Sequence, residues 1–185
     1  MTTLIDPVIG MLVMLSGAVL FATAAIHKLL SIARFEAALD AYRVLPRWLV
    51  SIAARTLPLL ELLCAGGMLV PAARSWAAAV AAGLLLAYCA AIAVNLRRGR
   101  RDIDCGCAGF GRTRPIHGWM IGRNSCIAAL LLCAVAPASS RSLSWIDAVT
   151  VLGGSAVLSL LYVALEELFA RGATGSRIPP QGTHS

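Results

Sequence analysis

The stretch Trp76–Val94, WAAAVAAGLLLAYCAAIAV, carries no charged residue, and the polar segment Asn95–Pro115, NLRRGRRDIDCGCAGFGRTRP, follows it directly. A helix needs about 20 apolar residues to cross a bilayer core of roughly 30 Å. The abrupt change from apolar to arginine-rich sequence is typical of a helix that leaves a membrane. The whole chain agrees, because 59% of its residues are hydrophobic and 14% are charged, whereas soluble domains have about 25% charged residues. We therefore expect an all-α integral membrane protein.

Further apolar runs of similar length lie before and after this stretch. The four tryptophans of the chain each stand at the beginning of a run, where the membrane–water interface favours tryptophan. The sequence predicts a polytopic membrane helical bundle with a four-helix core and a fifth transmembrane helix. The expected helices cover about 8–26, 48–70, 76–94, 119–137 and 145–165.

The arginines and lysines predict the orientation of these helices. The first and third connecting segments and the C-terminal tail are basic, whereas the second and fourth segments carry one arginine each. The positive-inside rule puts the basic segments in the cytoplasm, so we expect an inner-membrane protein with a periplasmic N-terminus and a cytoplasmic C-terminus. No basic residue precedes the first run, which we interpret as a retained helix rather than a cleaved signal peptide. The bundle is expected to cover 1–171, with a disordered tail at 172–185.

The first connecting segment contains its own helical pattern, ARFEAALDAYRVLP, at 33–46. Phe35, Leu39 and Tyr42 recur at helical spacing, which predicts an amphipathic helix on the membrane surface. Pro46 is expected to end it. We attribute the net charge of +7 to the basic segments that set the orientation in the membrane and that can contact anionic lipid headgroups. We therefore predict no nucleic-acid partner.

Cys105 and Cys107 are the cysteines that lie in a polar segment, with Gly106 between them. A disulfide between such close cysteines closes a small, strained ring, and strained, exposed disulfides are labile and oxidising. The neighbouring arginines favour the reactive thiolate. The pair is therefore a candidate catalytic redox pair. Metal binding is an alternative, but two thiolates supply half of a structural zinc site and His117 is the nearest further ligand. A structural role is the third interpretation.

Glu61 lies in the middle of the second apolar run, and an ionisable residue at membrane depth is a candidate functional residue. Cys64 is three residues later and shares its helix face. The alternative to a functional carboxylate is a structural ion pair that holds helices together. The expected partners for such a pair are Arg55, Arg123 and His27.

Two polar pairs mark the ends of apolar runs. We interpret Lys28 as a topology determinant that snorkels to the interface, with His27 beside it as a partner of Glu61 or a proton relay. Arg123, followed by Asn124, is placed to close over the preceding segment or to bind a lipid phosphate. The remaining cysteines either form a thiol relay or pack as small apolar residues; they are Cys64, Cys89, Cys126 and Cys133.

Several of these features occur together, in order, in one family. HKL at 27–29, RFEAALDAYRVLP at 34–46, Glu61, DCGCAGFG at 104–111 and GWMIGRN at 118–124 resemble the methylamine utilisation protein MauE family, which is related to the DoxX-like group. The resemblance covers about residues 10–135. It implies a role in processing, transport or maturation of the disulfide-rich small (beta) subunit of methylamine dehydrogenase, with the thioredoxin-like protein MauD as partner. It also implies that Cys105 and Cys107 are the family's paired cysteines and Glu61 its membrane carboxylate.

Three hypotheses for function follow. The first is thiol redox chemistry at Cys105 and Cys107 during maturation of the dehydrogenase subunit. The second is a non-catalytic membrane scaffold for the thioredoxin-like partner. The third is a small thiol or metal transporter. The sequence leaves open whether the chain is an enzyme; if it is one, the residues fit a thiol-disulfide oxidoreductase accessory protein, and we predict no cofactor. The first hypothesis contains a conflict, because the resemblance implies maturation of the subunit in the periplasm whereas the arginines put the cysteines on the cytoplasmic side.

Overall fold

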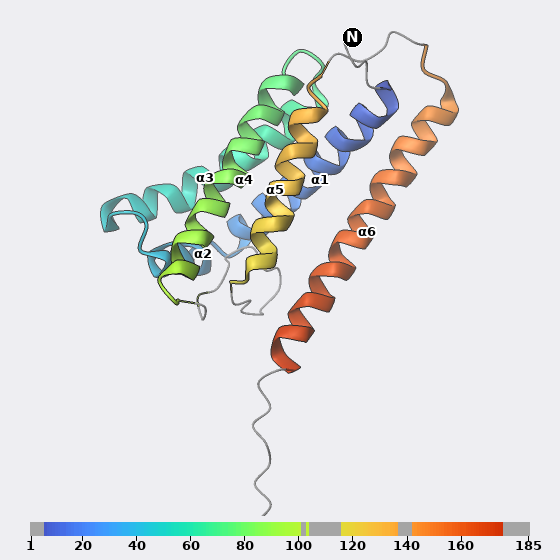
Figure 1. The fold of residues 1–185 in the computed structure, drawn as a ribbon. Coiled ribbons are helices and arrows are strands. Elements are labelled where there is room, and N and C mark those ends of the chain that lie inside the picture. Colours follow the sequence, from blue (N-terminus) through green and yellow to red (C-terminus); the bar gives the residue numbers. More distant parts are fainter. Residues whose placement is uncertain (1–5, 101–102, 104–115, 137–141, 176–185) are drawn as a thin grey trace, which may run out of the picture.

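The computed structural model describes residues 6–100, 103, 116–136 and 142–175, with side chains described as far as Leu168. Over these ranges the chain is all-helical (Figure 1), as the sequence predicts. Its helices are α1 (Pro7–Leu30), α2 (Ile32–Tyr42), α3 (Arg47–Leu69), α4 (Arg74–Arg97), α5 (Gly118–Cys133) and α6 (Trp145–Gly175).

Four of these helices, α1, α3, α4 and α6, are long and apolar enough to cross a membrane. Helix α5 is apolar but has 16 residues, a length of about 24 Å at 1.5 Å per residue. It ends at Cys133, before the expected end near 137. The chain is thus a multi-pass membrane protein in which α5 is the shortest of the apolar helices.

Helix α1 is in contact with most of the other helices of the bundle. Helix α1 packs against α3 and α6, α3 packs against α4, and α4 packs against α5. Helix α6 runs beside α1 along one side of the bundle, and α2 lies across the end where α1 and α3 are joined (Figure 1). The four-helix core is therefore α1, α3, α4 and α5, with α6 as the additional helix.

The predicted helix starts agree closely with the structure, whereas some ends differ. Helices α3, α4, α5 and α6 begin at or within two residues of the four tryptophans, and all four indole rings are exposed, as expected of interfacial side chains. Helix α1 continues to Leu30 rather than ending near 26. Helix α6 continues to Gly175, into the segment expected to be a tail, and 176–185 lie outside the described residues.

Helix α2 confirms the amphipathic pattern of the first connecting segment. Phe35 and Tyr42 are buried along one face, as predicted, whereas Leu39 is half-buried and Ala38 takes the buried position between them. This face packs on α3. The expected end at Pro46 is wrong, because the helix ends at Tyr42 and Arg43 adopts a left-handed conformation with φ 48°. The proline instead precedes the first residue of α3.

Small residues let the core helices approach one another closely. Gly67 of α3 faces α4 so closely that a Cβ at this position would lie 2.8 Å from the Cβ of Ala77. Helices in lipid gain most of their association energy from such close packing. The buried residues of the main core cluster include Met14, Ala18, Phe21, Cys64, Met68, Ala78, Ala81, Leu85, Ala128 and Leu131.

This packing predicts opposite effects for two adjacent glycines of α3. Gly67→Ala should lower the free energy of unfolding by about 1–3 kcal/mol, because neither Cβ belongs to a flexible side chain that can move aside. Gly66→Ala should leave it unchanged or raise it by up to about 1 kcal/mol, since a Cβ there meets nothing within 4 Å. Helicity followed during SDS titration in mixed micelles measures both. Equal free energies of unfolding for Gly67→Ala and Gly66→Ala would contradict the close contact between α3 and α4 at Gly67.

Candidate functional site

A buried ion pair joins three helices inside the bundle. Glu61 of α3 is 1% exposed and Lys28 of α1 is 3% exposed, and the Lys28 ammonium donates to Glu61 Oε1. The Tyr88 hydroxyl of α4 donates to the same oxygen at 2.6 Å. An unpaired charge in this position would be very costly, so the carboxylate and the ammonium require each other.

Two predictions about these residues are wrong. The ion-pair partner of Glu61 is Lys28 and not Arg55, Arg123 or His27. Lys28 does not snorkel, because its ammonium is enclosed 5.1 Å from the centroid of the Phe35 ring and 4.9 Å from that of Tyr88. The physical reason is the position of α2, which folds back directly after α1 and lays Phe35 over the ammonium. Cation–π attraction to both rings adds to the ion pair.

A second ion pair connects α5 to α6. Arg123 pairs with Glu166, and its guanidinium carbon lies 5.4 Å from the centroid of the Tyr162 ring. The same guanidinium donates to Asn124 Oδ1 from Nε at 3.1 Å and from Nη2 at 2.9 Å. The structure therefore directs Arg123 towards α6, a role that the sequence does not suggest.

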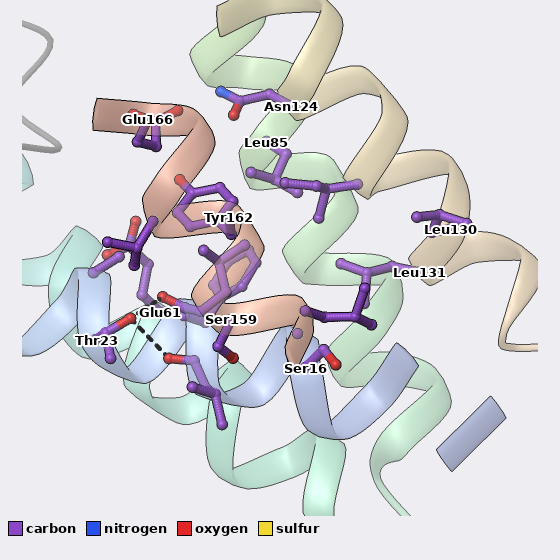
Figure 2. A pocket seen from close by; sticks show the side chains of 18 of the residues that line it. Ser16, Thr23, Glu61, Leu85, Asn124, Leu130, Leu131, Ser159, Tyr162 and Glu166 are labelled. Carbon is purple, nitrogen blue, oxygen red and sulfur yellow. Dashed lines mark hydrogen bonds between the residues drawn. The ribbon is translucent and has the colours of Figure 1, made fainter. Parts of the chain in front are cut away.

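The two ion pairs lie at one end of a cavity between α1, α5 and α6. The cavity has a volume of about 830 Å³, and Glu61, Tyr162, Glu166 and Asn124 line its polar end (Figure 2). His27, expected to pair with Glu61 or relay protons, also lines it. No donor among the described residues reaches Glu61 Oε2, so one oxygen of the buried carboxylate is available inside the bundle.

Cys105 and Cys107 lie outside the described residues, but Ile103 before them and Ile116 after them are described. Ile103 is 8% exposed and Ile116 is 0% exposed, and the Ile116 N–H donates to the Ile103 carbonyl at 3.1 Å. Both side chains pack in a cluster with Tyr42, Ile92 and Met120. Ile103 and Ile116, which bracket the cysteine-containing segment, are therefore held together within this buried cluster.

Asn95 secures the beginning of this segment. Its buried amide donates to the carbonyls of Tyr42 and Ala91, both at 3.0 Å, and its Oδ1 accepts from Arg100 at 3.2 Å. The side chain thus ties the end of α4 to the end of α2. The sequence gives little signal for this role beyond a lone amide directly after an apolar run.

The other four cysteines are free thiols. Cys64 is buried on the same face of α3 as Glu61, which confirms the predicted shared face. Cys89 is also buried, with its sulfur 3.6 Å from the Ile121 carbonyl oxygen, whereas Cys126 and Cys133 are exposed. Within the described ranges, no three His, Cys, Asp or Glu side chains cluster in a way that could hold a metal ion.

Comparison with known sequences identifies the family. The family model for "Methylamine utilisation protein MauE" matches residues 6–137. The chain belongs to the MauE family. It is 38% identical over 179 residues to a protein of Methylophilus methylotrophus named methylamine utilization protein MauE, covering 94% of this chain and 92% of the relative. Proteins of the same name from Paracoccus denitrificans and Methylorubrum extorquens are 34% and 37% identical, over 87% and 75% of this chain and 87% and 77% of the relatives. No solved structure matches the chain.

The part of the chain that matches the MauE family contains most of the site. Residues 6–137 include α1 to α5, the Lys28–Glu61 pair and the segment with Cys105 and Cys107. Helix α6, which supplies Tyr162 and Glu166 to the cavity, lies beyond the match. The Methylophilus relative nevertheless aligns with 94% of the chain.

The buried pair predicts a strong asymmetry between single and double substitution. Lys28→Met should lower the free energy of unfolding by about 3–5 kcal/mol, because it leaves Glu61 buried without its cation, and Lys28→Met/Glu61→Leu should recover most of the loss. Arg55→Met, which removes an exposed charge from α3, should stay within about 0.5 kcal/mol of the parent. SDS titration of all three variants measures this. A Lys28→Met protein as stable as Arg55→Met would contradict the pair.

Proposed function

We propose that this MauE-family protein assists processing, transport or maturation of the small (beta) subunit of methylamine dehydrogenase, with Cys105 and Cys107 as its redox pair. The observation that carries the proposal is membership of a methylamine utilisation family by a membrane chain with a Cys-Gly-Cys motif between two buried anchors. Cys105 lies two residues after Ile103, a reach of at most about 7 Å along the chain. The anchors thus support presentation of the thiols at one end of the bundle.

The proposed chemistry is thiol–disulfide exchange with a thioredoxin-like partner, MauD. A partner thiolate attacks one sulfur of the Cys105–Cys107 disulfide and forms a mixed disulfide, and the released cysteine takes up a proton. The second partner thiolate then breaks the mixed disulfide. The partner is oxidised by two electrons, and Cys105 and Cys107 are left as two thiols. The same steps run in reverse when the partner has the more oxidising potential.

We infer that the anchored segment faces the cytoplasm, in an inner-membrane protein with a periplasmic N-terminus. The inference rests on the arginines, which are concentrated in the segments that follow α1 and α4. The ends of α1 and α4, the starts of α3 and α5, and all of α2 lie at the same end of the bundle (Figure 1), which is consistent with one basic face. A cytoplasmic thiol pair that serves a periplasmic subunit has to pass electrons across the membrane.

We assign Glu61 a supporting role in this function. Its pair with Lys28 holds α1 against α3 at the end of the bundle that carries the cysteine segment. It is therefore proposed as a membrane carboxylate that positions the helices. The free energies of unfolding predicted above for Lys28→Met and Lys28→Met/Glu61→Leu test this positioning role directly.

The redox proposal predicts that both motif cysteines are required. Cys105→Ser and Cys107→Ser should each reduce mature, active methylamine dehydrogenase at least about tenfold in methylamine-grown cells whose own copy is deleted. Cys126→Ser, which changes an exposed thiol of α5, is the matched control and should retain full activity. Normal activity in both motif variants would exclude thiol chemistry. Normal activity in both, combined with loss on deletion of 104–115, would favour a scaffold for the partner.

The orientation predicts which thiols react from outside the cell. In a chain with the other four cysteines replaced by alanine, a membrane-impermeant maleimide should leave Cys105 and Cys107 unlabelled in intact cells. The reagent should label them after lysis and reduction. A cysteine placed at Thr2 serves as the control for reagent access from outside. Labelling of the motif in intact cells would reverse the orientation and make direct exchange with a periplasmic partner the simpler mechanism.

A further inference from the structure

The cavity between α1, α5 and α6 is not used by thiol exchange, and its shape is elongated. Its lining follows α1 from Val13 to Lys28, a distance of about 22 Å at 1.5 Å per residue. The volume of about 830 Å³ lies within the range of small-molecule sites, roughly 300–1,000 Å³. A long, narrow ligand would fit this space better than a compact one.

The polarity of the lining changes along the cavity. Along α1 the lining runs from Val13 to Lys28, and in Figure 2 Leu131 lies close to Ser16, away from Glu61 and Glu166. The charged side chains therefore belong to one end, and the other end is apolar apart from the Ser16 hydroxyl. The polar end coincides with the cytoplasmic end of α1 in the proposed orientation. Such a gradient matches an amphiphile with a polar head and an apolar chain.

The cavity opens towards the surroundings of the bundle through apolar side chains. Leu130 of α5 and Leu158 and Val163 of α6 line the cavity and are 50%, 44% and 58% exposed. These residues lie on apolar helices of a membrane protein, so their exposed atoms face lipid. A ligand would therefore enter from the bilayer rather than from water.

The available oxygen of Glu61 specifies the head of the ligand. Glu61 Oε2 is a buried polar atom of the cavity lining that meets no hydrogen-bond partner within the described chain. A carboxylate oxygen accepts hydrogen bonds, so the head must donate one. An anionic head is disfavoured by the carboxylates of the lining, Glu61, Glu166 and Glu167, and a cationic head bonded to Glu61 Oε2 would lie next to the Lys28 ammonium on the other oxygen. The site thus favours an uncharged hydroxyl.

We propose that the cavity binds a membrane-dissolved amphiphile whose uncharged hydroxyl head donates to Glu61 Oε2 and whose apolar chain lies between α5 and α6. Two kinds of membrane molecule share this chemistry: a hydroquinone with an apolar tail, and a neutral hydroxylated lipid such as a diacylglycerol. Of these two ligands, the hydroquinone rests on the proposed function, namely thiol chemistry at Cys105 and Cys107. Oxidation of two thiols to a disulfide releases two electrons and two protons, which a quinone takes up to become the hydroquinone.

Binding to the purified full chain in lipid nanodiscs tests the proposal. The probes are decylhydroquinone, its di-O-methyl ether and dioctanoylglycerol, and equilibrium dialysis measures their affinities. Decylhydroquinone or dioctanoylglycerol should bind at least about tenfold more tightly than the ether, which cannot donate to a carboxylate. Preference for the hydroquinone over dioctanoylglycerol identifies a quinone-class ligand, and the reverse identifies a neutral lipid. Equal affinity of both hydroxylated probes and the ether would overturn the proposal, as would no binding.

Two variants locate the site. Ser159→Leu fills the cavity from α6 and should weaken binding about tenfold, whereas Ala164→Leu, an exposed residue of α6 outside the lining, should leave it unchanged. Lys28→Met/Glu61→Leu should remove the preference for the hydroxyl over the ether. Unchanged affinity in Ser159→Leu would place binding elsewhere and contradict the proposal. If Ser159→Leu fails to fold, the comparison of probes on the parent chain still decides. These readouts need no dehydrogenase, so their failure is distinct from failure of the thiol chemistry.

Discussion

The ion pair between Lys28 and Glu61 is the interaction on which the rest of the bundle depends. Both groups are almost completely buried in helices long and apolar enough to span a membrane, where neither charge is tolerated without its partner. The pair therefore fixes the depth at which α1 and α3 meet. Tyr88 adds α4 to the same point through its hydrogen bond to the carboxylate. One polar contact thus sets the relative positions of three helices.

The same contact connects the cavity to the cysteine-containing segment. Glu61 offers its second oxygen at the polar end of the cavity, while Lys28 is covered by Phe35 of α2. The end of α2 is in turn tied to α4 by Asn95, next to the buried Ile103 that precedes the cysteines. A packed path therefore leads from the membrane carboxylate to the anchors of the proposed redox pair. This arrangement is the physical basis for the proposal that Glu61 supports the thiol motif by positioning the helices around its anchors.

Local composition was enough to predict the helices, but not which side chains of different helices contact one another. Apolar runs bounded by tryptophan and arginine report on each helix separately, so the starts of α3 to α6 were predicted within two residues. The pairing of Lys28 with Glu61 spans 33 positions, and a lysine at the end of an apolar run looks like an interfacial anchor until α2 is seen to fold over it. For Tyr88 the sequence carries one weak signal, because Tyr88 is the only residue with a hydroxyl group in the apolar run 76–94. The cavity results from where α6 packs, which no local pattern encodes.

The most direct test of the proposed function is the redox state of Cys105 and Cys107 in cells grown on methylamine. Acid quenching followed by alkylation and mass spectrometry gives the fraction of the pair present as a disulfide. The account predicts a measurable disulfide fraction that changes when the thioredoxin-like partner is deleted, because exchange with that partner turns the pair over. A pair that is fully reduced in both strains would contradict a redox role and leave the protein as a membrane scaffold.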